Sequence, residues 1–294
     1  MNSIKVTDAL GAQHEYQVIG LGTVGLPYQS VVPSYDLANA INIINDTYAV
    51  DVSVWEKAKN LIKFGRSTNI GTSKGTLWYT GQDEDNETYP ATDTNSIDTV
   101  SSSNVGDTEI VRVEGHTQTA GDRTFVVQTA TLNGQNKVVL GTPLNRMSRI
   151  AHNDGSDVDL LGEIYGYEDT AIVSGKPSDT TKLHVTIPSG SNTSQKASTS
   201  LSSTDFWIIE GFSAGFLTKS GSNVAEVNLE VRTQGGVFKE VCKPIVISTG
   251  KEGNKSFTPF LIVPPNSDVR LTGIASAAGQ ELTGDIYGYL AEII

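Results

Sequence analysis

The stretch Leu161–Tyr167 reads LGEIYGY, and Thr283–Tyr289 repeats it almost unchanged as TGDIYGY. Each copy places an isoleucine and two tyrosines around a glycine, and β-branched and aromatic residues are enriched in strands. A segment that is written twice, far apart in one chain, is the signature of a repeated structural unit. The sequence therefore predicts two copies of one β-rich unit, the second of them close to the C-terminus.

Further matches extend the repeat in the same order along both halves. The corresponding pairs are Val111–Glu114 with Val227–Glu230, Thr142–Leu144 with Thr258–Phe260, and Glu163–Tyr167 with Asp285–Tyr289. Duplication explains this order, and chance matching between strands of similar composition is the alternative. We expect two related β-sandwiches at 66–172 and 180–294, joined through 174–179 and preceded by an N-terminal arm or small subdomain at 1–65.

The hydrophobic pattern of most of the chain has a period of two. In Ala225–Arg232, apolar residues alternate with Glu, Asn, Glu and Arg, as in a strand with one buried face. Short strands between turns rich in Gly, Ser, Thr and Asn are typical of β-sandwiches and jelly rolls. The fold class is therefore all-β with little helix. A hairpin is expected before residue 20, a short helix over 37–44, a second helix over 54–62, and a type I′ hairpin turn at Asn133–Gly134.

Charge and cysteine content narrow the choice of partners. The 294 residues carry 21 Lys and Arg against 33 Asp and Glu, so the net charge is −12 and nucleic acid is an unfavourable partner. One cysteine, Cys242, excludes a disulfide within the chain. The chain has no apolar run of the roughly 18 residues that a membrane span needs, and no signal-peptide pattern at its start. We expect a protein that is soluble when made, with no membrane partner.

Two motifs have the form of catalytic or cofactor sites. Gly20–Gly25 fits G-x-G-x-x-G and resembles the nucleotide-binding start of nucleotide-sugar dehydrogenases, with Asp51 near the place of a ribose-binding acid. Pro27 and Pro33 stop the helix that a dinucleotide site requires, and no alternating strand and helix units follow. An NAD-dependent enzyme remains the alternative that rests on this motif, and a glycine-rich arm is the preferred interpretation.

The second motif, Gly211–Gly215, fits the G-x-S-x-G nucleophile elbow around Ser213. The histidine that serves this elbow follows the serine in α/β-hydrolases, whereas all four histidines of this chain precede it. We expect a loop between strands, no catalytic residues and no cofactor.

Two acidic segments offer oxygen ligands of the kind that calcium prefers. These are 83–87 and 153–159, and neither has the spacing of an EF-hand loop. Solvated loops are the preferred interpretation and calcium sites the alternative. No pairing of histidine with cysteine supports a zinc site.

Aromatic residues on the expected strands are candidates for a subunit interface. Aromatic side chains that alternate along strands pack cores or interfaces more often than they bind sugars, which is the alternative function. The interface candidates are Trp55, Phe64, Trp78, Tyr165, Tyr167, Tyr287 and Tyr289.

With FGRSTNIGT at Phe64–Thr72 and then Leu77–Trp78, the chain resembles a group of virion proteins of tailed bacteriophages, mainly from marine phages. The resemblance begins at Phe64–Thr72 (FGRSTNIGT), where Ser67–Thr68 replaces the usual polar pair, and continues at Leu77–Trp78. Further short motifs are VSSS at 100–103, GDT at 106–108, VEG at 113–115, TLNG at 131–134, RMSR at 146–149, IPSG at 187–190 and PPNSDV at 264–269. Residues 1–60 show no such resemblance.

The resemblance implies a structural component of the virion. The preferred function is a capsid decoration or cement protein on the outside of the head, which is made in the bacterial cytoplasm and bridges capsomers. Its partners would be the major capsid protein and further copies of itself, as a homotrimer. The alternative is a tail or fibre-base connector that binds host glycans.

Overall fold

The computed structural model describes residues 2–7, 13–18 and 58–292, except for 81–88, 91–92, 154, 156 and 218–221. The chain divides into two compact units, 1–56 and 57–294. In the first, β1 (Asn2–Thr7) and β2 (Gln13–Val18) form an antiparallel pair with Ile4 opposite Tyr16, so the predicted N-terminal hairpin is confirmed. The short helix expected near residue 40, Asp51, Trp55 and the Gly20–Gly25 motif lie outside the described residues.

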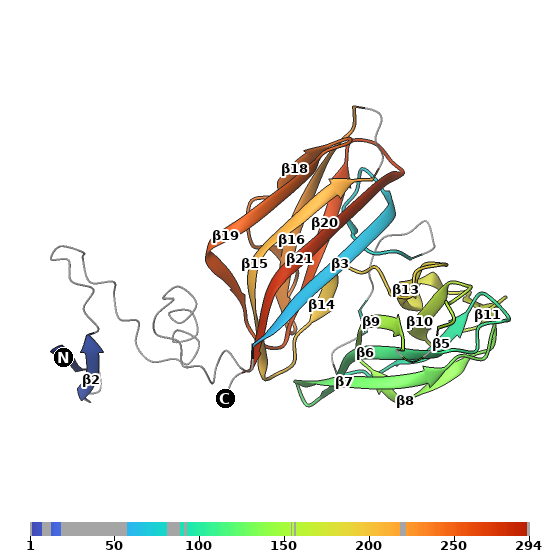
Figure 1. Ribbon diagram of the computed structural model, residues 1–294, viewed down its shortest axis with the longest axis horizontal. Helices are drawn as coiled ribbons and strands as arrows, with labels where there is room; N and C mark the ends of the chain where they lie inside the picture. The colour runs from blue at the N-terminus through green and yellow to red at the C-terminus, as the bar shows by residue number, and fades with distance from the viewer. Residues whose placement is uncertain are drawn as a thin grey trace. The chain divides into compact units, whose positions relative to one another are not determined.

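The second unit contains two β-sandwiches, of which we call one the C-terminal sandwich. Its first sheet has the order β19–β15–β21–β3 (Figure 1). In its second sheet β20 pairs with β16, β4 and β14 pair with the other side of β20, and β17 and β18 pair with the other side of β16. The strands are β3 (Lys59–Ile70), β4 (Gly75–Thr76), β14 (Ser198–Ser200), β15 (Asp205–Phe216), β16 (Val224–Thr233), β17 (Lys239–Glu240), β18 (Ile245–Ser248), β19 (Glu252–Val263), β20 (Ser267–Ala275) and β21 (Gln280–Glu292).

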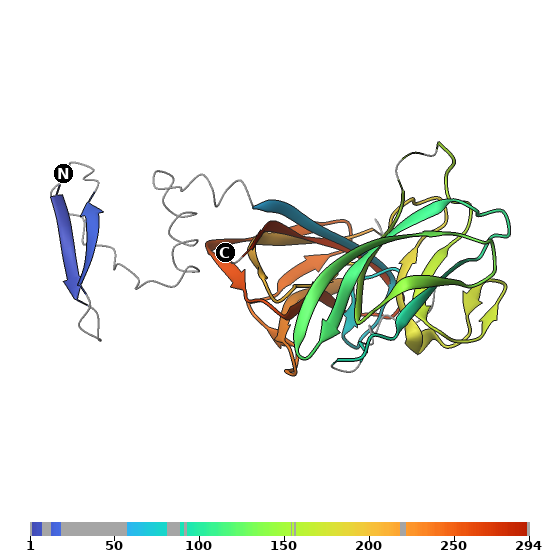
Figure 2. The same cartoon turned by 90° about the horizontal axis from the view of Figure 1, so that it is seen from below.

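The other body, which we call the inserted sandwich, lies in sequence between β4 and β14. Its sheets have the orders β13–β10–β5–β8 and β7–β6–β9, and Figure 2 shows these green and yellow strands again. The strands are β5 (Ile97–Ser102), β6 (Ile110–Thr119), β7 (Asp122–Thr131), β8 (Val138–Leu144), β9 (Arg146–His152), β10 (Ile164–Glu168) and β13 (Leu183–Ile187). A small hairpin of β11 (Ile172–Val173) and β12 (Lys176–Pro177) and the 3-10 turn η1 (Thr180–Lys182) connect β10 to β13.

Each sandwich has its own buried core. Trp207, Phe212 and Leu271 lie in the core of the C-terminal sandwich, and Val113, Met147 and Ile164 in that of the inserted one. The apolar residues of β16 that alternate in sequence, Ala225 to Leu229, face the first of these cores. The prediction of an all-β fold built from sandwiches is therefore confirmed.

The two sandwiches have the same topology. Strands β5, β6, β7, β8, β9 and β10 occupy the places of β15, β16, β18, β19, β20 and β21 in the sheet orders. Without β14 and β17, the strands of the C-terminal sandwich follow the chain as β3, β4, β15, β16, β18, β19, β20 and β21. One sheet contains the first, eighth, third and sixth of these in that order, namely β3, β21, β15 and β19. This is the strand order of a jelly roll. The repeated sequence motifs lie on matching strands, with Tyr165 on β10 and Tyr287 on β21, which supports a duplication.

The first strands of the two repeats are exchanged between the sandwiches. Strands β3 and β4 precede β5–β10 in the chain but pair with β21 and β20, as Figure 1 shows for the blue strand beside β21. Conversely, β13 precedes β15–β21 but pairs with β10, and Thr193 pairs with Ala151 beside β9. The chain therefore contains two consecutive repeats of equal length, 59–168 and 183–292. The first strands of each repeat pair with strands of the other repeat.

The domain boundaries in space consequently differ from those expected at 65/66 and 172–180. The expected first boundary falls inside β3, and β13, expected in the second sandwich, belongs to the first. The boundaries of the sequence repeats are set by their order along the chain. The boundaries of the two buried cores are set by which strands pair. A pattern of residues carries no information about which of two similar sheets a first strand joins.

Two local predictions are wrong. Residues 59–62 belong to the strand β3 and not to a helix, because pairing with β21 satisfies their backbone and leaves Ile62 and Phe64 on the outer side. Asn133–Gly134 does not form a type I′ hairpin, because β7 and β8 lie in different sheets. Of the two turn residues, only Gly134 has a positive φ, of 53°, and a Cβ there would lie 2.5 Å from the Val105 carbonyl oxygen.

Candidate functional site

The junction between the two sandwiches is built from two short segments that cross from one to the other. Residues 75–79 pair with 195–197: the Tyr79 amide donates to the Gln195 carbonyl at 2.8 Å, and the Ala197 amide to the Leu77 carbonyl at 2.9 Å. Leu271 on β20 donates its amide to the carbonyl of the same Ala197 at 2.9 Å. The backbone of β20, in the C-terminal sandwich, is thus continuous with segments that enter the inserted one.

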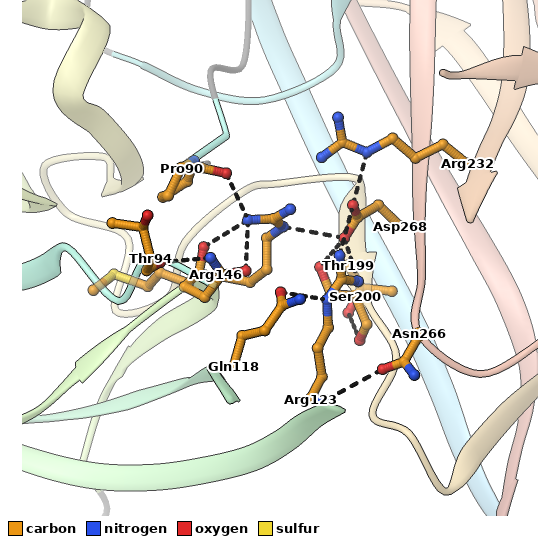
Figure 3. A network of polar contacts seen from close by, with 12 residues as sticks. Pro90, Thr94, Gln118, Arg123, Arg146, Thr199, Ser200, Arg232, Asn266 and Asp268 are labelled. Atoms are coloured by element: carbon orange, nitrogen blue, oxygen red, sulfur yellow. Dashed lines mark hydrogen bonds and ion pairs between the residues drawn. The ribbon is translucent and has the colours of Figure 1, made fainter. Parts of the chain in front are cut away.

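Asp268 lies at the centre of this junction and is completely buried. Arg123 on β7 donates Nη1 to Oδ1 of Asp268 at 2.8 Å and Nη2 to Oδ2 at 3.2 Å. Arg146 on β9 donates Nε to Oδ1 at 3.2 Å, and Arg232 on β16 donates Nε to Oδ2 at 2.8 Å (Figure 3). Ser200 donates its hydroxyl to Oδ1 at 2.6 Å. Three arginines from both sandwiches therefore converge on one carboxylate.

Aromatic rings hold two of these arginines from the side. The Arg146 and Arg232 guanidinium carbons lie 4.8 Å and 4.2 Å from the centroid of the Tyr89 ring. Phe238, whose ring centroid is 5.7 Å from that of Tyr89, stacks on Arg232 at 4.6 Å and on Arg270 at 3.8 Å. Guanidinium groups are attracted to aromatic faces, so the rings fix the orientation of the arginines.

A cavity of about 260 Å³ opens beside this cluster. Its lining consists of Tyr89, Pro90, Arg123, Arg146, Arg232, Gln234, Gly235, Gly236 and Asp268. Arg146 also donates Nη1 to the carbonyls of Pro90 and Asn145, at 3.3 and 2.9 Å. The cavity is thus polar and rich in N–H donors, and it lies where the two sandwiches meet.

The electrostatics of the cluster keep Asp268 ionised. Burial alone raises the pKa of a carboxyl group, but the charges of Arg146, Arg123 and Arg232 oppose this and hold the pKa of Asp268 well below its usual range. Burial lowers the pKa of Arg123, against the opposing effect of Asp268. Nearby His116 is buried, and its desolvation, together with the charge of Arg123, lowers its pKa to about 3. The imidazole is therefore neutral at pH 7.

A second polar cluster lies where segment 75–79 meets the inserted sandwich. Glu163 accepts hydrogen bonds from the hydroxyl groups of Tyr165 and Tyr79, the latter at 2.6 Å. Burial and this carboxylate raise the pKa of Tyr79 to about 12. Lys196 donates Nζ to the Met147 and His184 carbonyls at 3.0 and 2.9 Å. These contacts attach the crossing segments to the inserted sandwich.

No protein family matches the chain, and no curated protein matches it. Among solved structures, it is similar to capsid structures of infectious bursal disease virus. The Gt strain structure has 14% identity and a TM-score of 0.21, with 80% of this chain and 72% of that chain covered. The VP2 subviral particle has 14% identity and a TM-score of 0.21, with 87% and 76% covered. The T=1 particle has 13% identity and a TM-score of 0.22, with 80% and 69% covered.

The aromatic interface candidates occupy two different environments. Trp78, Tyr165 and Tyr167 form a buried cluster with Leu183 inside the chain. Both faces of β10 are covered, one by Met147 and Ile150 and the other by this cluster, so Ile164–Tyr167 are all buried. Phe64 on β3 is exposed, and Tyr287 and Tyr289 on β21 are half-buried.

The catalytic motif inside the described residues has the wrong structural context for a nucleophile elbow. Ser213 lies within β15, paired with Asn254 on one side and Asp285 on the other, and its hydroxyl donates to the Asp285 carboxylate. An elbow requires a sharp turn from a strand into a helix. The expectation that Gly211–Gly215 forms a loop is also wrong, because these residues are part of the strand.

For the acidic segments, the structure describes only part. Residues 83–87 lie outside the described residues, and in 153–159 the carboxylate of Asp159 accepts from the Asn192 amide at 2.7 Å. Within the described part of the chain, no three His, Cys, Asp or Glu side chains are placed to hold a metal ion together. The same described residues contain no helix that is long and apolar enough to cross a membrane.

Local sequence patterns do not indicate the arginine cluster. Arg146 and Asp268 fall within the RMSR and PPNSDV strings of the phage resemblance, but 122 residues separate them. Charged residues on strands are ordinarily solvated, and no spacing rule connects partners on two different sheets. The exchange of first strands is what brings β9 and β20 together.

Proposed function

We propose that the chain is a structural protein of a virion, and specifically a capsid decoration protein of a tailed phage that bridges capsomers. The observation that carries the proposal is the pair of duplicated jelly rolls, which share strands and a buried ion cluster. Polar and aromatic groups from both sandwiches contact one another at the junction. The phage-protein motifs quoted above fall on the strands and turns of these two sandwiches, which supports a structural role in a virion.

The mechanism is a shift of the assembly equilibrium by added interface. A subunit that binds several neighbouring capsomers at once buries surface that exists only in the assembled shell. The bound state then favours the closed particle over its parts. Binding as a homotrimer on the outside of the head would repeat each contact by symmetry. The net charge of −12 keeps free copies apart until they meet a complementary surface.

A group of exposed apolar residues at one end of the inserted sandwich is our candidate for the capsid contact. We call Val105, Val158 and Leu161 the loop surface, and each of these side chains is more than half exposed. Asp107 joins the two loops by accepting from the Leu161 amide at 2.8 Å and the Gly162 amide at 2.9 Å. Apolar side chains on such braced loops suit docking to a second protein.

The test is reconstitution on particles that lack this protein. The purified chain should bind them in many copies spread over the head, as counted from particle mass, and raise the temperature at which the particles open. A few copies located at the tail vertex would instead identify the tail connector, and no binding would contradict both assignments.

A pair of variants tests the loop surface. Val105→Asp should weaken binding to the particle at least tenfold, because a charge in an apolar contact loses its hydration. Val246→Asp is the matched control, since Val246 is similarly exposed but lies on β18 of the C-terminal sandwich. If the two variants bind the particle equally well, the loop surface is not part of the capsid contact.

A further inference from the structure

We propose that the cavity at the junction binds a single small oxyanion of the phosphate or sulfate class, held between Arg146 and Arg232. The anion would connect the two sandwiches, because Arg146 belongs to the inserted sandwich and Arg232 to the C-terminal one. This binding site is additional to the capsid contact and does not depend on it.

The first argument is charge. Among the described residues that line the cavity, Arg123, Arg146 and Arg232 each carry one positive charge, and Asp268 carries the only negative one. Glu230, two positions before Arg232 on β16, is already paired with Arg270 at 2.9 Å and Lys74 at 2.7 Å. The described lining residues therefore carry an excess of two positive charges, in a chain that is otherwise strongly acidic. Oxyanions with two negative charges match this excess.

The second argument is the position of the unused donors. Arg123 uses both Nη atoms on Asp268, whereas Arg232 bonds it through Nε alone. Within the described residues, the terminal nitrogens of Arg232 form no hydrogen bond, and Figure 3 shows them directed away from Asp268. Stacking on Tyr89 and Phe238 fixes this guanidinium before any ligand arrives. Arginine forks that are preorganised in this way favour bidentate binding of phosphate and sulfate.

The third argument is size and selectivity. A cavity of about 260 Å³ has room for one oxyanion with bound water, and Gln234 and the turn at Gly235–Gly236 line its other side. A nucleic acid presents the same phosphate chemistry, but the chain's net charge of −12 repels a polymer of phosphates. The geometry therefore favours a free ion over a polyanion.

The experiment is calorimetric titration of the full chain with sodium phosphate, with sodium sulfate, and with sodium chloride at matched ionic strength. Phosphate or sulfate should bind saturably and raise the midpoint of thermal unfolding, because a ligand that binds only the folded state stabilises it. Chloride should do neither. The absence of saturable binding of both oxyanions would overturn the proposal, as would tighter binding of a short DNA duplex than of phosphate.

Variants connect the binding to the cavity. Arg232→Gln should lower the affinity for phosphate tenfold or more, because charged hydrogen bonds are lost. Arg66→Gln is the control, since Arg66 is a partly exposed arginine that pairs with Glu281 away from the cavity. If Arg232→Gln fails to fold, Gln234→Ala removes a lining side chain that has no bond to Asp268, and a severalfold loss is expected. Unchanged affinity in folded cavity variants would overturn the assignment.

Discussion

At the scale of single residues, Asp268 is the group on which the junction depends most. Its carboxylate accepts from arginines on β7, β9 and β16, so one side chain from β20 joins both sandwiches. A buried ion cluster contributes little more than a well-packed apolar one would, because desolvation offsets the attraction. Removal of one partner has a far larger effect, since the remaining charges stay buried without compensation.

We therefore expect Asp268→Asn to lower the free energy of unfolding by about 3–5 kcal/mol, measured by urea denaturation at pH 7. The amide keeps the size of the carboxylate but leaves three guanidinium groups facing one another. Asp169→Asn is the control: Asp169 pairs with Lys137 in solvent, and its replacement should leave stability unchanged. Similar stability of the two variants would show that Asp268 does not stabilise the junction.

His116 should make the stability of the chain depend on pH in mildly acidic solution. Its folded pKa of about 3 lies below its ordinary value of 6.5, so between these values the unfolded chain binds a proton that the folded chain does not. The free energy of unfolding is fully retained above pH 6.5 and should fall as the pH decreases toward 3, by up to about 1.4 kcal/mol per pH unit.

Urea denaturation at about pH 7, 6.5, 6 and 5.5 measures this slope above the range in which most carboxylates titrate. In His116→Gln the slope should be smaller, because the titrating group is absent. A slope that is identical in the variant and the wild type would assign the acid sensitivity to other groups.

At the scale of elements, β3 shows what determines the placement of a strand. Gly65, in the FGR string, lies where β3 passes over the two crossing segments: a Cβ there would be 2.1 Å from the Leu77 carbonyl oxygen and 2.3 Å from the Ala197 amide nitrogen. The close approach of three backbones at this point needs a residue without a side chain.

Gly65→Ala should lower the free energy of unfolding by about 1–3 kcal/mol or more, because backbone atoms must move to admit the methyl group. Gly71→Ala is the matched control just beyond the end of β3, where the nearest atom to an added Cβ is 3.9 Å away. Thermal unfolding of both variants, followed by circular dichroism, makes the comparison. Equal midpoints would mean that β3 lies farther from the crossing segments.

The sequence predicted the elements better than their partners. The alternation in Ala225–Arg232 predicts the strand β16, because an alternating pattern reports burial directly. Strand β3 was mistaken for a helix in its first half, because its outer residues Ile62 and Phe64 are apolar and hide the alternation. Asp268 was not predicted, because its partners depend on long-range pairing that local patterns do not encode.

At the scale of the whole second unit, the exchange of first strands makes each sandwich incomplete without residues from the other repeat. The C-terminal sandwich contains β3 and β4 from the first repeat, and the inserted sandwich contains β13 from the second. Two sandwiches joined only by a linker would separate when that linker is cut. Two sandwiches that share strands remain associated, since separation would remove an edge strand from each and expose both cores.

A cut between the repeats distinguishes these arrangements. Val173 and Ser174 are exposed at the start of the turn of the β11–β12 hairpin, which lies between the repeats, so a protease site inserted there can be cleaved in the folded chain. After cleavage, the two fragments should elute together as one species in size-exclusion chromatography and separate only in denaturant. As a control, the uncut variant should elute at the same volume. Fragments that separate in native buffer would contradict the exchange, because β3 would then not be held in the sheet of β21.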